Sequence, residues 1–241
     1  MKYFHEKYEN CAFPFNVLCA YNECRFERKR GNYSVMRENL REIIDALSGY
    51  TTPELCDGAG LYHSMDYQIK PQFGSPGIVG TAVTVDVPSG ESGLVAEAVL
   101  RLKPGDVLVV SGKGNCQCSY WGDHRSLCAK MMGAAGVVID GAFRDYEGCG
   151  EVGFPVYAKA LTCGTAGKSG AGAINVPVSC GGVCVHPGDI VVGDINGVCV
   201  FPPDQAEAIM ERASAKRLAQ EKVIEQMKRS GTVVTKIELN K

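Results

Sequence analysis

Three charged residues near the middle of the chain have the types and spacing of a small catalytic site. Asp123 is followed, after twenty intervening residues, by the adjacent pair Arg144-Asp145. An arginine guanidinium presents a planar fork of donors to a carboxylate, and an aspartate is a hard oxygen ligand for a divalent cation. Asp123 is placed to position a water beside them. Together these groups could bind a 2-oxo acid and polarise its carbonyl group.

The secondary-structure pattern predicts that these three residues meet. Buried strands are expected over residues 106–110 and 137–139, joined by a helix over 123–135. Such a crossover makes the two strands parallel neighbours, so the loops that follow them leave the same carboxyl edge of the sheet. Arg144 and Asp145 should therefore converge on the helix N-terminus, whose free backbone N–H groups form an anion site. Residues 111–122 are expected to form a loop.

The same three residues also have a purely structural interpretation. Adjacent arginine and aspartate residues are common on protein surfaces as solvated charges. Asp123 could simply cap the helix that it begins. The spacing alone leaves both interpretations open.

The remaining pattern predicts one α/β domain with a helical addition at each end. Thr52-Pro53-Glu54 carries the signals of a helix start, and strands then alternate with helices before two closing strands. A long charged helix follows. The chain is therefore divided into a partly helical N-terminal extension (1–50), an α/β domain (51–204) and a C-terminal helical arm (205–241).

Composition and charge argue against several classes of protein. The 241 residues include 25 Lys and Arg and 27 Asp and Glu, a formal net charge of −2. A chain with this balance has no basic field to attract nucleic acid or a membrane surface. The apolar runs are too short to span a bilayer, and the N-terminus lacks the apolar core of a signal peptide. We therefore expect a cytoplasmic protein with neither nucleic acid nor membrane as a partner.

Twelve cysteines are many for such a protein. The paired CxxC spacing of a zinc ribbon or an iron–sulfur site is absent, and a disulfide framework does not suit a cytoplasmic chain. The cysteines are therefore predicted to be reduced and to act as small hydrophobic residues. Cys184 and Cys199, each within a Gly-Val-Cys-Val sequence, are expected in strands.

The spacing of the three charged residues resembles the D-x20-R-D motif of the HMG/CHA aldolases. These are the 4-hydroxy-4-methyl-2-oxoglutarate and 4-carboxy-4-hydroxy-2-oxoadipate aldolases, within the family of the regulator of ribonuclease activity A (RraA-like). The resemblance covers roughly residues 52–229 and implies a layered β/β/α sandwich, the RraA-like swivelling domain. Further similar segments are residues 136–145, Gly181-Gly-Val183, Pro187-Gly-Asp189 and residues 193–198.

The resemblance assigns roles to residues of this chain. Asp145 would bind Mg²⁺ or Mn²⁺ directly, with waters at most other positions. Arg144 would hold the carboxylate and the C2 oxygen of pyruvate, a small 2-oxo acid, at the helix N-terminus that begins after Gly122. The backbone N–H groups of Asp123, His124 and Arg125 would assist. Asp123 would also orient or activate the water that serves as base or acid.

Two further acids match family positions approximately. Asp57 and Glu221 would complete the water shell of the metal ion, with Glu221 contributed by a neighbouring subunit of a homotrimer or a dimer of trimers. The sequence departs from the aldolases at His124 and Arg125, where apolar residues are common. The added cationic groups would either favour a more anionic substrate or obstruct the known ones.

The resemblance leaves two main functions open. The first is a metal-dependent lyase that cleaves a 4-hydroxy-2-oxo acid to pyruvate and a second carbonyl compound, with oxaloacetate decarboxylation as a side reaction. The second is a non-catalytic RraA-like regulator that acts by binding a protein partner. Quinone methylation, an older label for this family, finds no support because the sequence has no adenosylmethionine-type glycine-rich loop.

Overall fold

The computed structural model describes residues 33–60, 63–74 and 77–237, with only the backbone for residues 33–39. The chain divides into two compact units, residues 1–40 and 41–241. Most of the predicted N-terminal extension, residues 1–32, lies outside the described residues. The second unit contains the sheet, the helices that cover it and the C-terminal helix.

The elements of the described chain follow the predicted order of two helices, alternating strands and helices, short strands and a long helix. The helices are α2 (Tyr33–Leu47), α3 (Thr52–Ala59), α4 (Gly93–Val99), α5 (Asp123–Met131), α6 (Tyr146–Val152), the 3₁₀ turn η1 (Pro203–Gln205) and α7 (Ala206–Ser230). The strands are β1 (Lys70–Pro71), β2 (Ile78–Asp86), β3 (Asp106–Ser119), β4 (Gly136–Phe143), β5 (Val156–Leu161), β6 (Ala173–Ile174), β7 (Val178–Cys180), β8 (Val183–Val185), β9 (Ile190–Asp194) and β10 (Gly197–Phe201).

The main sheet has the strand order β1-β5-β4-β3-β2-β9-β10, with the short β6 paired to β2. Strands β2 to β5 are parallel neighbours, which confirms the predicted crossover between β3 and β4. The outer strands β1, β9 and β10 run antiparallel to their neighbours. The two ends of the sheet approach each other, because Lys70 Nζ on β1 donates to the Asn196 carbonyl in the β9–β10 turn at 2.5 Å. The sheet is therefore nearly closed into a barrel.

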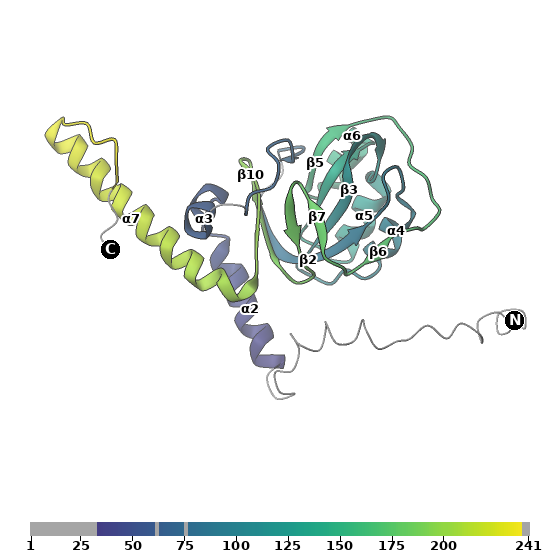
Figure 1. Cartoon of the computed structure of the whole chain (residues 1–241), viewed down its shortest axis with the longest axis horizontal. Helices are drawn as coiled ribbons and strands as arrows, with labels where there is room; N and C mark the ends of the chain where they lie inside the picture. Colours follow the sequence, from purple (N-terminus) through teal and green to yellow (C-terminus); the bar gives the residue numbers. More distant parts are fainter. Residues whose placement is uncertain (1–32, 61–62, 75–76, 238–241) are drawn as a thin grey trace, which may run out of the picture. The chain divides into compact units, whose positions relative to one another are not determined.

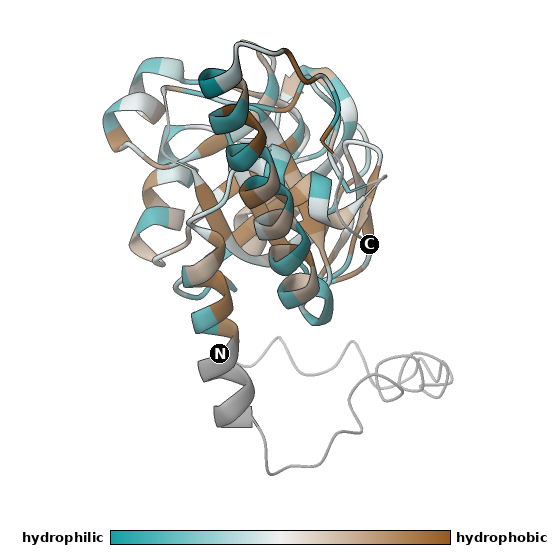
Figure 2. Cartoon of the chain, turned by 90° about the vertical axis from the view of Figure 1, so that its left-hand side faces the viewer, coloured by the Kyte–Doolittle hydropathy of each residue, from teal (hydrophilic) through white to brown (hydrophobic). Residues whose placement is uncertain are grey.

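The sheet has an apolar core on each face. One core packs the sheet against helices α4 to α6, and the other packs it against the β7–β8 hairpin (Figure 1). Every residue of β4 is buried, as expected for a parallel strand covered on both faces. The hydropathy colouring shows apolar strands inside more hydrophilic helices (Figure 2). This arrangement confirms the predicted layered α/β fold.

Two predicted boundaries are wrong. Residues 111–119 belong to β3 and not to a loop, although the pairing with β4 shifts register between Val110 and Asn115 and again before Ser119. Lys113 and Gly114 have φ values of 59° and 71°, in the left-handed region. They form a β-bulge, and the strand continues beyond it to Ser119. The helix expected over 123–135 ends at Met131. Helix α6 was not predicted.

Helix α7 packs on α3 through a close backbone contact. A Cβ atom on Gly58 would lie 2.3 Å from the Ile209 carbonyl oxygen, so only glycine permits this approach. Arg212 Nε donates to the Gly58 carbonyl at 2.5 Å, and Lys216 pairs with Asp57 at 2.7 Å. These contacts hold the first part of the C-terminal helix against the domain.

The nine cysteines in the described part of the chain are all free thiols. Cys199 is buried in β10 as predicted, whereas Cys184 in β8 is exposed because its side chain faces away from the sheet. No helix among the described residues has the length and apolar character needed to cross a membrane.

Candidate functional site

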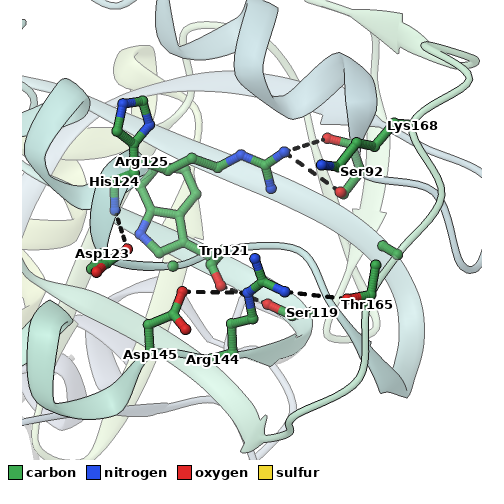
Figure 3. Close-up of a pocket in the computed structure, with 12 residues that line it drawn as sticks. Ser92, Ser119, Trp121, Asp123, His124, Arg125, Arg144, Asp145, Thr165 and Lys168 are labelled. Carbon is green, nitrogen blue, oxygen red and sulfur yellow. Dashed lines mark hydrogen bonds and ion pairs between the residues drawn. The ribbon is translucent and has the colours of Figure 1, made fainter.

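A pocket of about 440 Å³ lies at the carboxyl edge of the parallel strands (Figure 3). Its walls come from the segment between β3 and α5, the segment between β4 and α6, the start of α4, and the connection that follows β5. Its lining residues are Ser92, Ser119, Trp121, Gly122, Asp123, His124, Arg125, Arg144, Asp145, Thr165, Ala166 and Lys168.

Two glycines make room for the two acids of this pocket. Gly122 precedes α5, and a Cβ atom there would lie 2.5 Å from Asp145 Oδ2. Gly148 lies on α6, and a Cβ atom there would lie 2.8 Å from Asp123 Oδ2. Each carboxylate therefore packs against a backbone position that has no side chain. These two close contacts, Asp145 against Gly122 and Asp123 against Gly148, allow the first turns of α5 and α6 to lie close together.

Asp145 has a backbone conformation that non-glycine residues rarely adopt. Its φ and ψ are 58° and 49°, in the left-handed region, and it forms the N-cap of α6. This conformation costs about 1 kcal/mol or more and is enriched at functional sites. The left-handed conformation also ends the alternation of side chains between the two faces of β4. The adjacent side chains of Arg144 and Asp145 can therefore both line the pocket. The Cys149 N–H donates to the Asp145 carbonyl at 2.8 Å and fixes the turn.

Arg144 is held in place but keeps free donors. Its backbone N–H donates to the Trp121 carbonyl at 3.0 Å. Its Nε lies 3.3 Å from Asp145 Oδ2, and its Nη1 donates to Thr165 Oγ1 at 3.2 Å. These two side-chain contacts use two of the five guanidinium N–H groups. With 45% of its side chain exposed, the guanidinium remains available to an anion in the pocket.

Asp123 interacts with the first turn of its own helix. Its Oδ1 accepts the His124 backbone N–H at 2.6 Å. In this conformation that amide is therefore not available to a ligand, although it was predicted to contribute to the anion site. The contact also fits the interpretation that Asp123 stabilises the start of α5. Its Oδ2 lies on the side of α6.

Arg125 is a partly buried cation in the same wall. Its guanidinium donates to the Tyr120 carbonyl at 2.6 Å and to the Ser92 carbonyl at 2.9 Å. Burial lowers the pKa of Arg125 below its ordinary value, and the nearby positive charge of Arg144 lowers it further. The residue stays charged at physiological pH, because the ordinary arginine pKa lies far above that range.

The structure brings most of the predicted site residues into one pocket. The residues predicted to lie there and found there are Gly122, Asp123, His124, Arg125, Arg144 and Asp145. Asp57 and Glu221 do not line the pocket of their own chain. Asp57 lies on α3 in its ion pair with Lys216, and Glu221 is an exposed residue of α7.

The sequence reasoning missed the opposite wall, which Thr165, Ala166 and Lys168 form after β5. This connection is fixed by Glu91, whose Oε2 accepts the Ser169 N–H and hydroxyl, each at 2.9 Å. The one sequence feature that could have indicated this wall is the run of small residues over 164–172, because small residues allow the backbone to pack closely beside a ligand site.

The donor groups of the pocket fit one kind of metal ion. No cluster of three or more His, Cys, Asp or Glu side chains suited to a metal is found in residues 33–60, 63–74 and 77–237. A cation here would be held mainly by Asp145, whose side chain is 40% exposed beside the gap left by Gly122. Mg²⁺ suits such a site because it retains several waters, whereas structural Zn²⁺ requires four protein ligands.

Comparison with known proteins identifies the family. A family model described as "RraA-like: Aldolase/RraA" matches residues 52–200, more than half of the chain. A protein of Halalkalibacterium halodurans, named "Putative 4-hydroxy-4-methyl-2-oxoglutarate aldolase", is 39% identical over 175 residues, covering 73% of this chain and 78% of the relative. The chain belongs to the RraA-like family, which confirms the resemblance inferred from the D-x20-R-D motif.

Two solved structures show the same fold. An uncharacterized protein from Pseudomonas syringae pv. tomato str. DC3000 has a TM-score of 0.69 at 26% identity, covering 80% of this chain and 91% of that one. The "RNA-processing inhibitor RraA from Thermus thermophilis" has a TM-score of 0.59 at 30% identity, covering 64% of this chain and 93% of that one. The family therefore includes members described as aldolases and members described as inhibitors of RNA processing.

Proposed function

We propose that this protein is a divalent-metal-dependent lyase that cleaves a 4-hydroxy-2-oxo acid to pyruvate and a second carbonyl compound. The observation that carries the proposal is the meeting of Asp123, Arg144 and Asp145 in one pocket at the start of α5. The aldolase names of relatives at up to 39% identity support the same reaction class.

Arg144 and the start of α5 would bind the 2-oxo acid end of the substrate. The free N–H groups of the guanidinium suit a carboxylate, and the positive end of the helix dipole adds to the attraction. Thr165 and Asp145 hold the guanidinium from two sides, so it is oriented before the substrate arrives. Such preorganisation lowers the cost of ordering the site on binding.

Asp123 would move the proton that cleavage requires. The C4 hydroxyl loses its proton to a water oriented by Asp123, the C4 oxygen becomes a carbonyl, and the C3–C4 bond breaks. The bonding electron pair passes to C3 and into the enolate of pyruvate, which takes a proton at C3 to give pyruvate. A water hydrogen-bonded to Asp123 could take the proton from the C4 hydroxyl and return one to C3, because Asp123 lines the pocket.

Asp145 would hold a Mg²⁺ or Mn²⁺ ion. When bound, such an ion supplies polarisation of the 2-oxo group and stabilises negative charge on its oxygen. The pocket residues fit this role through a single exposed carboxylate with space beside it. Oxaloacetate decarboxylation would follow from the same chemistry, because loss of CO₂ also leaves an electron pair at C3.

The proposal is tested by measuring pyruvate release from 4-hydroxy-4-methyl-2-oxoglutarate and from oxaloacetate with Mg²⁺ or with EDTA. We expect release that EDTA abolishes and that falls at least a hundredfold in Asp145→Ala. Asp204→Ala is the matched control, because Asp204 is an exposed acid of η1 outside the pocket. An Asp145→Ala enzyme that is folded and fully active would refute the proposal.

The second candidate function is a non-catalytic regulator. The 30% identity to a protein described as an RNA-processing inhibitor favours it. The two functions separate in the same assay, because a regulator releases no pyruvate with Mg²⁺ or with EDTA. The adjacent acid in Arg144-Asp145, with its strained backbone directed at the pocket, favours the lyase.

We also propose that the protein assembles as a homotrimer or a dimer of trimers, in which Glu221 reaches the pocket of a neighbouring subunit. Glu221 is exposed on α7, beyond the residues that pack on α3. Light scattering would measure the subunit number. Glu221→Gln should then lower pyruvate release without changing that number.

A further inference from the structure

Arg125 is a pocket cation that has no counter-ion within the described part of the chain. Its hydrogen bonds go to the Tyr120 and Ser92 carbonyls and, at 3.5 Å, to the Ser92 hydroxyl, all of them uncharged groups. Across the described residues, no carboxylate lies within ion-pair distance of Arg125 or of Lys168, which lines the same pocket. Arg144, in contrast, is paired with Asp145.

This arrangement is costly without an anionic ligand. A partly buried cation loses hydration, and a second cation nearby adds repulsion. Both effects act on Arg125, because it is removed from water and lies near Arg144. The carbonyl groups of Tyr120 and Ser92 offset part of the lost hydration, but they carry no net charge.

The position of Arg125 relative to Arg144 indicates what such an anion would be. Both arginines line the pocket, and Figure 3 shows the guanidinium of Arg125 above that of Arg144, with Ser92 and Lys168 to its right. An anion bound at Arg144 would therefore have a second cationic position within the same pocket. A carbon chain with a carboxylate at each end would engage both guanidinium groups.

We propose that Arg125 is a specificity-determining residue of this chain: it binds the substrate carboxylate remote from the 2-oxo acid end, and it is the source of the preference for 2-oxo acids with two carboxylates over those with one. This inference rests on the proposed function, in which Arg144 binds the 2-oxo acid end. Lys168 adds an exposed positive charge to the same pocket. The fixed hydrogen bonds to Tyr120 and Ser92 orient the Arg125 fork before binding.

The test compares two probes that the enzyme cannot cleave. 2-Oxoglutarate and 2-oxopentanoate share a five-carbon chain and a 2-oxo acid end, and they differ in the carboxylate at C5. Isothermal titration calorimetry with Mg²⁺ present gives a Kd for each. We expect the wild-type protein to bind 2-oxoglutarate at least tenfold more tightly, equivalent to about 1.4 kcal/mol.

Two variants separate specificity from structure. Arg125→Gln retains donors for the neighbouring carbonyl groups but removes the charge, and it should bring the ratio of the two Kd values close to one. Arg125→Lys retains the charge and should keep most of the preference. A ratio of Kd values near one in the wild type, or an unchanged ratio in Arg125→Gln, would overturn the proposal. Arg125 would then have only the structural role of hydrogen-bonding to the Tyr120 and Ser92 carbonyls. If Arg125→Gln does not fold, the test uses the wild type and Arg125→Lys. A preference for 2-oxoglutarate in both supports the proposal, and no preference in the wild type overturns it.

Failure of this inference differs from failure of the proposed function. Pyruvate release with no preference between the probes would overturn the role of Arg125 and leave the lyase intact. A clear preference with no pyruvate release would remove the lyase, and with it the substrate assignment, while showing a pocket that binds dicarboxylates.

Discussion

Replacing Gly122 by alanine should displace the acid on which the proposed chemistry depends. The new Cβ would lie 2.5 Å from Asp145 Oδ2, whereas ordinary contact begins near 3.4 Å, so the carboxylate must retreat by about 0.9 Å. A misplacement of about 1 Å in a catalytic site costs on the order of a hundredfold in rate. We therefore expect kcat/KM for pyruvate release to fall about a hundredfold, a loss of about 2.7 kcal/mol of transition-state stabilisation.

The same substitution should barely affect folding. Gly122 has a φ of −163°, an extended conformation that alanine adopts readily, and the clashing atom is the end of a half-exposed side chain. The loss of glycine before α5 should cost less than about 1 kcal/mol of unfolding free energy.

The assay couples pyruvate release to lactate dehydrogenase, and urea denaturation measures stability in parallel. Gly49→Ala is the matched control, because its Cβ would meet the nearest atom at an ordinary 3.4 Å and lies outside the pocket. A Gly122→Ala enzyme with wild-type kcat/KM would refute the reasoning that the position of Asp145 limits the reaction.

Three further predictions concern stability and are measured by urea denaturation. Lys159→Met should lower the unfolding free energy by about 3 kcal/mol, since it removes the only cation paired with the buried Asp140 among the described residues, at 2.7 Å, and leaves that carboxylate with the Gly181 N–H. A loss below about 1 kcal/mol would count against this. Gly58→Ala should cost about 2 kcal/mol by forcing α3 away from the α7 backbone, and an unchanged midpoint would contradict the close contact. Burial alone would raise the pKa of Asp194, but hydrogen bonds from Thr52 hold that pKa below its ordinary value. Its stabilising effect should therefore be complete above about pH 5 and lost as the pH falls below about 4, so the wild type and Asp194→Asn should differ at neutral pH and converge in acid.

The fold could be predicted where buried runs are continuous. The buried runs 106–110 and 137–139, which are rich in β-branched residues, indicated the parallel pair β3–β4, and the helix between them fixed which loops share an edge. The extension of β3 to Ser119 could not be predicted, because a bulged strand with several glycines has the composition of a loop. Helix α6 was missed because its seven residues include two glycines.

The candidate site could be predicted only in part. Asp123 begins a recognisable helix, and Arg144-Asp145 come shortly after the buried strand to which that helix leads, so topology alone brought them together. The wall that carries Thr165 and Lys168 is positioned by the contact between Glu91 and Ser169, which lie 78 residues apart. Such a long-range contact leaves no periodic signal in the sequence. The left-handed conformation of Asp145 is likewise set by tertiary packing.

Crystals soaked with pyruvate and Mn²⁺ would test the central claim most directly, since anomalous scattering locates manganese without ambiguity. We expect a single anomalous peak within about 2.5 Å of an Asp145 carboxylate oxygen. We also expect pyruvate density with its carboxylate on the Arg144 guanidinium at the start of α5. Manganese and pyruvate bound elsewhere, or a pocket that binds neither at saturating concentration, would contradict it.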